Sequence, residues 1–143
     1  MKTIIKNKNT ISKKDNLIIL ANKNTKLASY DLNSDEKNYV KSQQKNKQEI
    51  IVINQYSRKI IIVNPNKNKE GNLFVENIRC LANKVFSELK EIGSVSFKNL
   101  DIDNIDSYAF VEGLSLSNYE FNNHKSKAKK GKILTINIIN NNG

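Results

Sequence analysis

The sequence predicts an α/β domain in which a mixed β-sheet of about six strands is flanked by helices. Short runs of β-branched residues, each about as long as a buried strand, recur along the chain. Between them lie longer segments whose apolar residues recur with helical spacing. A chain of 143 residues has the usual size of one domain, so we predict a single α/β domain over residues 1–143.

The strands are predicted from continuous or alternating apolar residues. Ile50–Ile53 and Ile60–Val63 are β-branched runs of the kind found in a sheet that is covered on both faces. The link from Gln55 to Arg58 is too short for a helical crossover, so these two strands are predicted to be antiparallel neighbours. The predicted strands are Thr3–Ile5, Leu17–Ala21, Glu49–Asn54, Lys59–Asn64, Ser94–Lys98 and Lys132–Ile139.

Two helices are predicted between the first five strands. Ser34 is a candidate N-cap for a short surface helix from Asp35 to about Gln44, in which acidic residues come first and lysines later. The clearest helix of the chain has Asn72 as its N-cap and ends at Gly93. Its apolar residues form one broad stripe, which predicts that this helix docks on a face of the sheet.

A third helix begins at Asp103 or Asn104 and is apolar on most faces as far as Tyr119, so other elements are expected to cover it. Gly113 in the middle of this helix costs roughly 1 kcal/mol against alanine. That cost predicts a neighbouring backbone that packs close to Gly113. Glu112 lies in the same apolar setting, so we expect it to be paired or to lie at the rim of a contact.

The net charge of +10 would ordinarily indicate an anionic partner such as a nucleic acid. Of the 24 basic residues only Arg58 and Arg79 are arginines, and arginine supplies the bidentate contacts that phosphate and guanine recognition favours. We therefore interpret most of the lysines as a solvated surface. A nucleic-acid-binding module is an alternative, and its site would be Lys125, Lys127, Lys129 and Lys130. Tyr119 and Phe121 lie nearby in the sequence as possible stacking groups.

Residues that could carry chemistry are few. His124 is the only histidine and Cys80 the only cysteine, so a zinc site made of these residue types is not expected, and both are interpreted as surface residues. Asp101, Asp103 and Asp106 could bind a hard cation, but their place before a helix is explained by capping and the helix dipole. The glycines are too far apart for a phosphate-binding loop. We predict no catalytic, cofactor-binding or metal-binding residue in this chain.

The cellular location is predicted from what the sequence does not contain. No apolar run approaches the roughly 18 residues that a membrane span needs, and the first residues turn polar too soon for a signal peptide. A single cysteine cannot form an internal disulfide, which fits a reducing compartment. We expect a cytoplasmic protein with no membrane partner.

One segment of the third helix has a specific pattern. Its residues are Glu112-Gly113-Leu114, then Leu116, Tyr119, Phe121 and Lys125. This pattern resembles the segment that closes the N-terminal domain of the leucyl (cytosol) aminopeptidase family. The resemblance implies a small α/β domain of macro-like topology, followed in the family by a larger domain that carries all the catalytic residues. That larger domain holds two divalent metal ions, zinc or manganese, so the resemblance implies no cofactor in this chain.

By the same resemblance, the chain would be a non-catalytic assembly or regulatory domain of a dinuclear metallopeptidase. Its partners would be the catalytic domain of the same parent protein, toward which residues 125–143 would lead, and further copies, since the family forms hexamers. A macro-type domain that binds a nucleotide or ADP-ribose is the second alternative. The paired glycines of its phosphate loops are missing from this chain.

Overall fold

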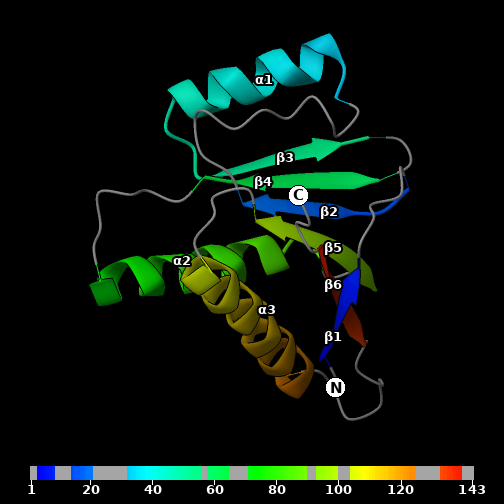
Figure 1. Cartoon of the computed structure of the whole chain (residues 1–143), viewed down its shortest axis with the longest axis vertical. Coiled ribbons are helices and arrows are strands. Elements are labelled where there is room, and N and C mark those ends of the chain that lie inside the picture. The colour runs from blue at the N-terminus through cyan, green and yellow to red at the C-terminus, as the bar shows by residue number, and fades with distance from the viewer. Residues whose placement is uncertain are drawn as a thin grey trace.

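The computed structural model describes residues 3–8, 14–20, 32–55, 58–64, 71–89, 93–99, 104–124 and 133–139. Within these residues, strands and helices follow one another in the predicted order (Figure 1). The strands are β1 (Thr3–Lys8), β2 (Leu17–Leu20), β3 (Ile50–Asn54), β4 (Lys59–Val63), β5 (Ser94–Asn99) and β6 (Leu134–Ile139). The helices are α1 (Ser34–Lys45), α2 (Gly71–Phe86) and α3 (Asn104–His124).

The strands form one mixed sheet in the order β1-β6-β5-β2-β4-β3. Neighbouring strands are parallel from β1 as far as β4, and β3 lies antiparallel to β4. At the turn between β3 and β4, Gln55 N–H donates to the Arg58 carbonyl at 2.8 Å and Arg58 N–H donates to the Gln55 carbonyl at 3.2 Å. The predicted α/β class, the mixed sheet and the antiparallel pair are therefore confirmed.

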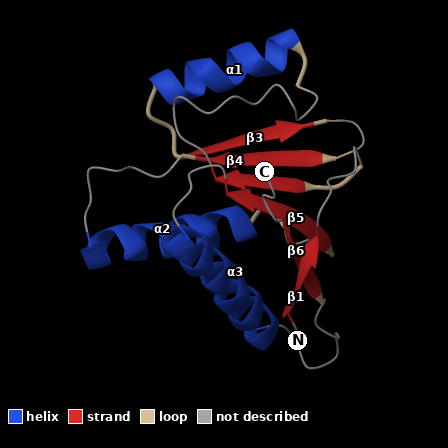
Figure 2. Ribbon diagram, in the orientation of Figure 1, coloured by secondary structure: helices blue, strands red, loops and turns tan. Residues whose placement is uncertain are grey.

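The sheet lies between α1 on one side and the α2–α3 pair on the other (Figure 2). Successive residues of a strand point to opposite faces, and β2 shows this division clearly. Ile18 belongs to the apolar core under α2 and α3, whereas Leu17 belongs to the core under α1. On the α2–α3 face the rings of Phe97 and Phe110 stack with their centroids 5.3 Å apart, which joins β5 to α3.

The face of the sheet on the α1 side changes character between β5 and β2. Strand register places the following residues side by side across the sheet: Lys6, Asn137, Ser96, Leu17, Ile60 and Ile53. The half formed by β1, β6 and β5 is therefore polar along this row, and the half formed by β2, β4 and β3 is apolar. Val40 of α1 packs with the apolar half.

The N-cap of α1 differs from the prediction. Asn33, not Ser34, is the N-cap, and Ser34 is the first helical residue. The Asn33 side-chain oxygen accepts from Glu36 N–H at 2.8 Å, and Asn33 N–H donates to Glu36 Oε1 at 2.9 Å. This reciprocal capping box satisfies two backbone donors at once, which a serine one residue later could not do with the same glutamate.

The limits of α2 also differ from the prediction. The helix begins at Gly71 and ends at Phe86, so Asn72 lies inside it and Gly93 lies well beyond its end. After Phe86 the N–H groups of Glu88 and Leu89 donate to carbonyls three residues earlier, at 2.9 and 2.8 Å, so the chain tightens into turns. The apolar stripe continues through this turn because Leu89 is still buried.

Candidate functional site

The segment that resembles the aminopeptidase family lies where α3 packs on α2. A Cβ atom built on Gly113 would come within 2.7 Å of Ala82 Cβ and within 3.2 Å of the Arg79 Cα and carbonyl oxygen. Contacts this short leave no room for a side chain at residue 113. The predicted close approach of a neighbouring backbone is confirmed, and the neighbour is α2.

Arg79 links the two helices at the rim of this contact. Its Nη1 lies 2.7 Å from Glu76 Oε1 within α2, and its Nη2 lies 3.1 Å from Glu112 Oε1 on α3. The prediction that Glu112 is paired or lies at the rim of a contact is confirmed, because Glu112 is paired with Arg79 at the rim. Exposed ion pairs contribute little free energy, typically about 0–1 kcal/mol, so this pair fixes the geometry of the rim more than it stabilises the fold.

Two buried polar residues continue the attachment of α3 toward the sheet. The Ser117 hydroxyl lies 2.8 Å from the Gly113 carbonyl and 3.0 Å from Asn83 Oδ1. Asn118 Nδ2 donates to Thr3 Oγ1 at 3.0 Å, which ties α3 to β1. The polar residues of this segment therefore set where α3 lies relative to α2 and to the edge of the sheet.

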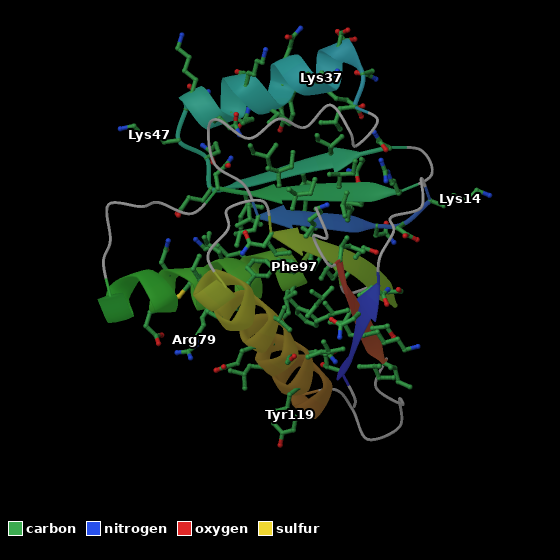
Figure 3. The ribbon with its side chains drawn as sticks, in the orientation of Figure 1. Lys14, Lys37, Lys47, Arg79, Phe97 and Tyr119 are labelled. Carbon is green, nitrogen blue, oxygen red and sulfur yellow. The ribbon has the colours of Figure 1, made fainter. Side chains whose placement is uncertain are left out.

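The outer side of α3 departs from the prediction that other elements cover the helix. Leu116 is 50% exposed and Tyr119 is 60% exposed, and the Tyr119 side chain points away from the rest of the molecule (Figure 3). The reason is the spacing of these residues: Glu112, Leu116 and Tyr119 fall on one face, opposite the buried residues Phe110 and Leu114. We call Leu116 and Tyr119 the α3 outer face.

The residues considered for chemistry are not gathered into a site in the described part of the chain. Cys80 is exposed on α2, in agreement with the prediction. His124 is the last residue of α3, and its side chain lies outside the described residues, as do Asp101, Asp103 and the Asp106 side chain. Among the side chains that the structure describes, no group of three or more His, Cys, Asp or Glu is placed to hold a metal ion.

The lysines proposed for nucleic-acid binding, Lys125, Lys127, Lys129 and Lys130, lie outside the described residues, so that site stays a prediction. Arg79 is the residue of the rim that the sequence analysis did not single out. Its only local signal was its place three residues after Glu76 on the polar side of α2. The contact with Glu112 joins two helices, and no local pattern could have indicated it.

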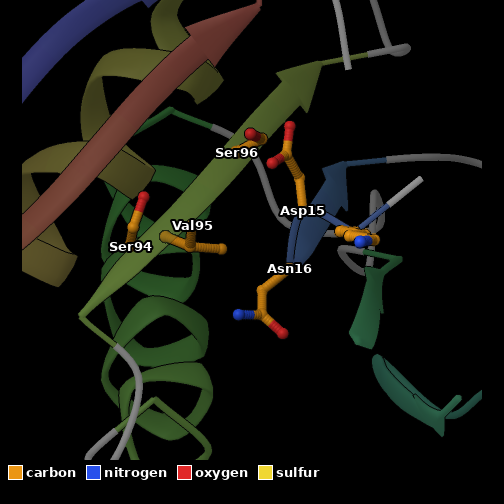
Figure 4. Close-up of a pocket in the computed structure, with 6 residues that line it drawn as sticks. Asp15, Asn16, Ser94, Val95 and Ser96 are labelled. Carbon is orange, nitrogen blue, oxygen red and sulfur yellow. The ribbon is translucent and has the colours of Figure 1, made fainter. Parts of the chain in front are cut away.

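A small polar pocket of about 120 Å³ lies at the amino ends of β2 and β5 (Figure 4). Its lining residues are Lys14, Asp15, Asn16, Ser94, Val95 and Ser96. Asn16 has a structural role here, since its side-chain oxygen accepts from Lys59 N–H at 2.9 Å and its carbonyl accepts from Ser96 N–H at 2.8 Å. The pocket lacks the apolar lining of a typical ligand site, and parallel α/β sheets bind ligands at the opposite, carboxyl ends of their strands.

In the described residues, no helix combines the length and the apolar character needed to cross a bilayer.

Comparison with models of known protein families finds no match, and neither does comparison with curated protein sequences. Solved structures do match. A mutant of tomato leucine aminopeptidase superimposes with a TM-score of 0.64 at 14% sequence identity. That match covers 97% of this chain and 32% of the tomato chain.

A mutant of the macrodomain of Oceanobacillus iheyensis superimposes with a TM-score of 0.57 at 12% identity, over 96% of this chain and 83% of the macrodomain. The chain has a macrodomain-like fold. The fold expected from the family resemblance is thus present. This chain spans about one third of the length of the tomato enzyme. Sequence identity this low shows the fold alone, so activity and partners are matters for proposal.

Proposed function

We propose that this chain acts as a non-catalytic N-terminal domain, with an assembly or regulatory role, in a leucyl aminopeptidase-like dinuclear metallopeptidase. The observation that carries the proposal is the superposition of 97% of this chain on 32% of a leucine aminopeptidase. The family-like residues add to it, because Glu112 and Gly113 both lie at the α2–α3 contact. In this proposal the two metal ions and the catalytic residues belong to the companion catalytic domain.

The α3 outer face is the surface through which the domain would meet its companion. Leu116 and Tyr119 are exposed one turn apart, and Arg79 lies nearby on α2, held between Glu76 and Glu112. Tyrosine and arginine are enriched at protein–protein interfaces, whose centres are apolar and whose rims are polar. The α3 outer face supplies the apolar centre of such an interface, and the ion pairs of Arg79 supply its polar rim.

Catalysis and association test the proposal separately. The purified chain, given Mn²⁺ or Zn²⁺ and a leucine chromogenic substrate, is expected to show no turnover, and clear turnover would contradict the proposal. Coexpressed with the catalytic domain of a leucyl aminopeptidase from the same cell, it is expected to copurify. Leu116→Ser with Tyr119→Ser should abolish copurification, whereas Tyr39→Ser, which changes an exposed tyrosine on α1, should leave it intact.

A second candidate function is nucleotide or ADP-ribose binding, which the macrodomain likeness favours. In sheets of this kind ligands lie outside the carboxyl ends of the strands. Added ADP-ribose would then raise the melting temperature of the chain, since a ligand that binds only the folded state stabilises it. An unchanged melting temperature at millimolar ADP-ribose would contradict this second candidate function.

A further inference from the structure

The outer side of α1 carries a row of lysines. Lys37, Lys41 and Lys45 are spaced four residues apart, which places them one above another on the helix surface over about 12 Å. All three are exposed, whereas Val40, which lies three residues after Lys37 at the flank of the row, is buried against the sheet. We call these three residues the lysine row; Figure 3 labels Lys37 on α1, with the neighbouring Lys47 beyond the end of the helix.

The stability of α1 accounts for only part of the lysine row, because Lys45 alone lies in the last turn, where the helix dipole favours a cation. Like charges four residues apart destabilise a helix, and Lys37 lies in the first half of α1, where the helix dipole disfavours a cation. The carboxylates of α1, Asp35 and Glu36, are not three or four residues from any lysine of the row. Glu36 is also engaged by Asn33 and by Gln55 Nε2 at 3.2 Å.

In the part of the chain that the structure describes, other elements bring no carboxylate to the lysine row. No ion pair joins Lys37, Lys41 or Lys45 to a carboxylate in the residues that the structure describes. By contrast, Lys59 on β4 lies 3.2 Å from Glu88 Oε2, which shows that this chain does pair lysines where a carboxylate is within reach. The row therefore presents three positive charges to the solvent that no described carboxylate pairs.

We propose that the lysine row docks on an acidic protein surface that carries carboxylates at similar spacing. Lysine ammonium groups pair with single carboxylates in many geometries, whereas phosphate recognition favours arginine, and α1 contains none. A bilayer surface would require an apolar face, but Val40 is turned to the sheet. Tyr39 lies two residues from both Lys37 and Lys41, on another side of the helix, so it cannot supply the stacking that single-stranded nucleic acid uses.

This proposal is independent of the α3 outer face, since α1 and α3 lie on opposite faces of the sheet. A triple variant, Lys37→Gln with Lys41→Gln and Lys45→Gln, removes the row while keeping helix propensity almost unchanged. The control variant, Lys6→Gln with Lys14→Gln and Lys84→Gln, removes the same charge from exposed lysines on other elements. A third variant with arginine at the three row positions restores the charge.

Fluorescence anisotropy with labelled poly-L-glutamate at about 50 mM salt, where screening is moderate, measures docking. Loss of the row is expected to weaken binding about tenfold, against less than about threefold for the control, with the arginine variant close to the parent. Equal losses of affinity in both glutamine variants would overturn the proposal, because they would show that binding depends on net charge and not on the position of the lysines. So would tighter, row-dependent binding of a single-stranded oligonucleotide or of phosphatidylserine vesicles. Circular dichroism confirms that each variant is folded.

Discussion

The two faces of the sheet hold their helices in different ways. Under α2 and α3 lies a continuous apolar core to which β2, β4, β5 and β6 all contribute. Under α1 the described part of the core is smaller: it consists of residues of β2, β4 and β3 together with Leu32, and the helix itself contributes one buried side chain, Val40. Among the described residues, apolar burial under α2 and α3 is therefore extensive, whereas apolar burial under α1 is small.

Hydrogen bonds at the two ends of α1 add to the burial of Val40 in holding the helix. At its start, Glu36 accepts from Gln55 Nε2 at 3.2 Å, and Gln55 Oε1 accepts from Arg58 Nε at 2.9 Å, so the helix is tied to the β3–β4 turn. At its end, Gln44 Nε2 lies 3.5 Å from Asn64 Oδ1, just after β4. A polar helix can thus be held on a sheet partly by its termini, which leaves its outer side free to carry charge.

The largest effect is expected on the α2–α3 face. Phe110→Ala removes a fully buried ring that stacks on Phe97 and should lower the free energy of unfolding by about 3–5 kcal/mol. The smaller change on the other face, Val40→Ala, should cost about 2 kcal/mol, since fewer buried carbons are lost. Urea denaturation measures both. A loss of unfolding free energy for Val40→Ala as large as that for Phe110→Ala would contradict the difference in burial between the two faces.

Gly113→Ala tests the close packing of α3 on α2. The added methyl would lie 2.7 Å from Ala82 Cβ and 3.2 Å from the Arg79 backbone, and neither neighbour is a flexible chain end. Overpacking costs about 1–3 kcal/mol and outweighs the roughly 1 kcal/mol gained in helix propensity, so a net loss is expected. Gly93→Ala is the control, because nothing lies within 4 Å of its Cβ position; a stabilised Gly113→Ala variant would contradict the packing.

The sequence predicted those features of the fold that depend on local patterns. The β-branched runs of β3 and β4 and their short link determined an antiparallel pair, and the cost of glycine in a helix indicated the close contact at Gly113. It could not predict that β1 pairs with β6, as in the Thr3–Leu134 pair, because that choice depends on contacts between distant segments. For the same reason it could not tell that α2 is the helix that meets Gly113.

The α3 outer face shows the corresponding limit for the candidate site. Helical spacing places Leu116 and Tyr119 on one side of α3, but spacing does not say whether another element covers that side. The capping of α1 was within reach of the sequence. Asn33 is followed three residues later by Glu36, which is the capping-box spacing, whereas Ser34 is followed by Lys37.

A smaller effect is expected at the start of α1. Asn33→Ala removes the side-chain oxygen that accepts from Glu36 N–H and should cost about 1 kcal/mol, within the range for lost N-caps. Ser34→Ala should change stability by less than about 0.5 kcal/mol, because an exposed residue of the first turn has no cap to lose. Thermal denaturation of the two variants decides between the caps, and a larger loss for Ser34→Ala would favour the cap that the sequence first suggested.

The smallest effect is expected at the end of α1, and it has the opposite sign. Lys47 has a φ of 60°, a left-handed conformation that glycine adopts without strain. It follows the C-cap Asn46, and Gln48 N–H donates to the Gln43 carbonyl at 3.0 Å while Lys47 N–H donates to the Gln44 carbonyl at 3.0 Å. These two hydrogen bonds form a Schellman motif, in which glycine is the usual residue at the position of Lys47.

Lys47→Gly is therefore expected to raise the free energy of unfolding by about 0.5–1 kcal/mol, even though glycine is more flexible when unfolded. Lys47→Ala removes the same charge but keeps the Cβ atom, so it should bring no gain, and the difference between the two variants isolates backbone strain from charge. Urea titration of both measures that difference. If glycine brings no gain over alanine, the end of α1 is not governed by its backbone geometry. The position of α1 would then depend mainly on the burial of Val40. The two faces of the sheet would then hold their helices in the same way and differ only in the amount of apolar burial.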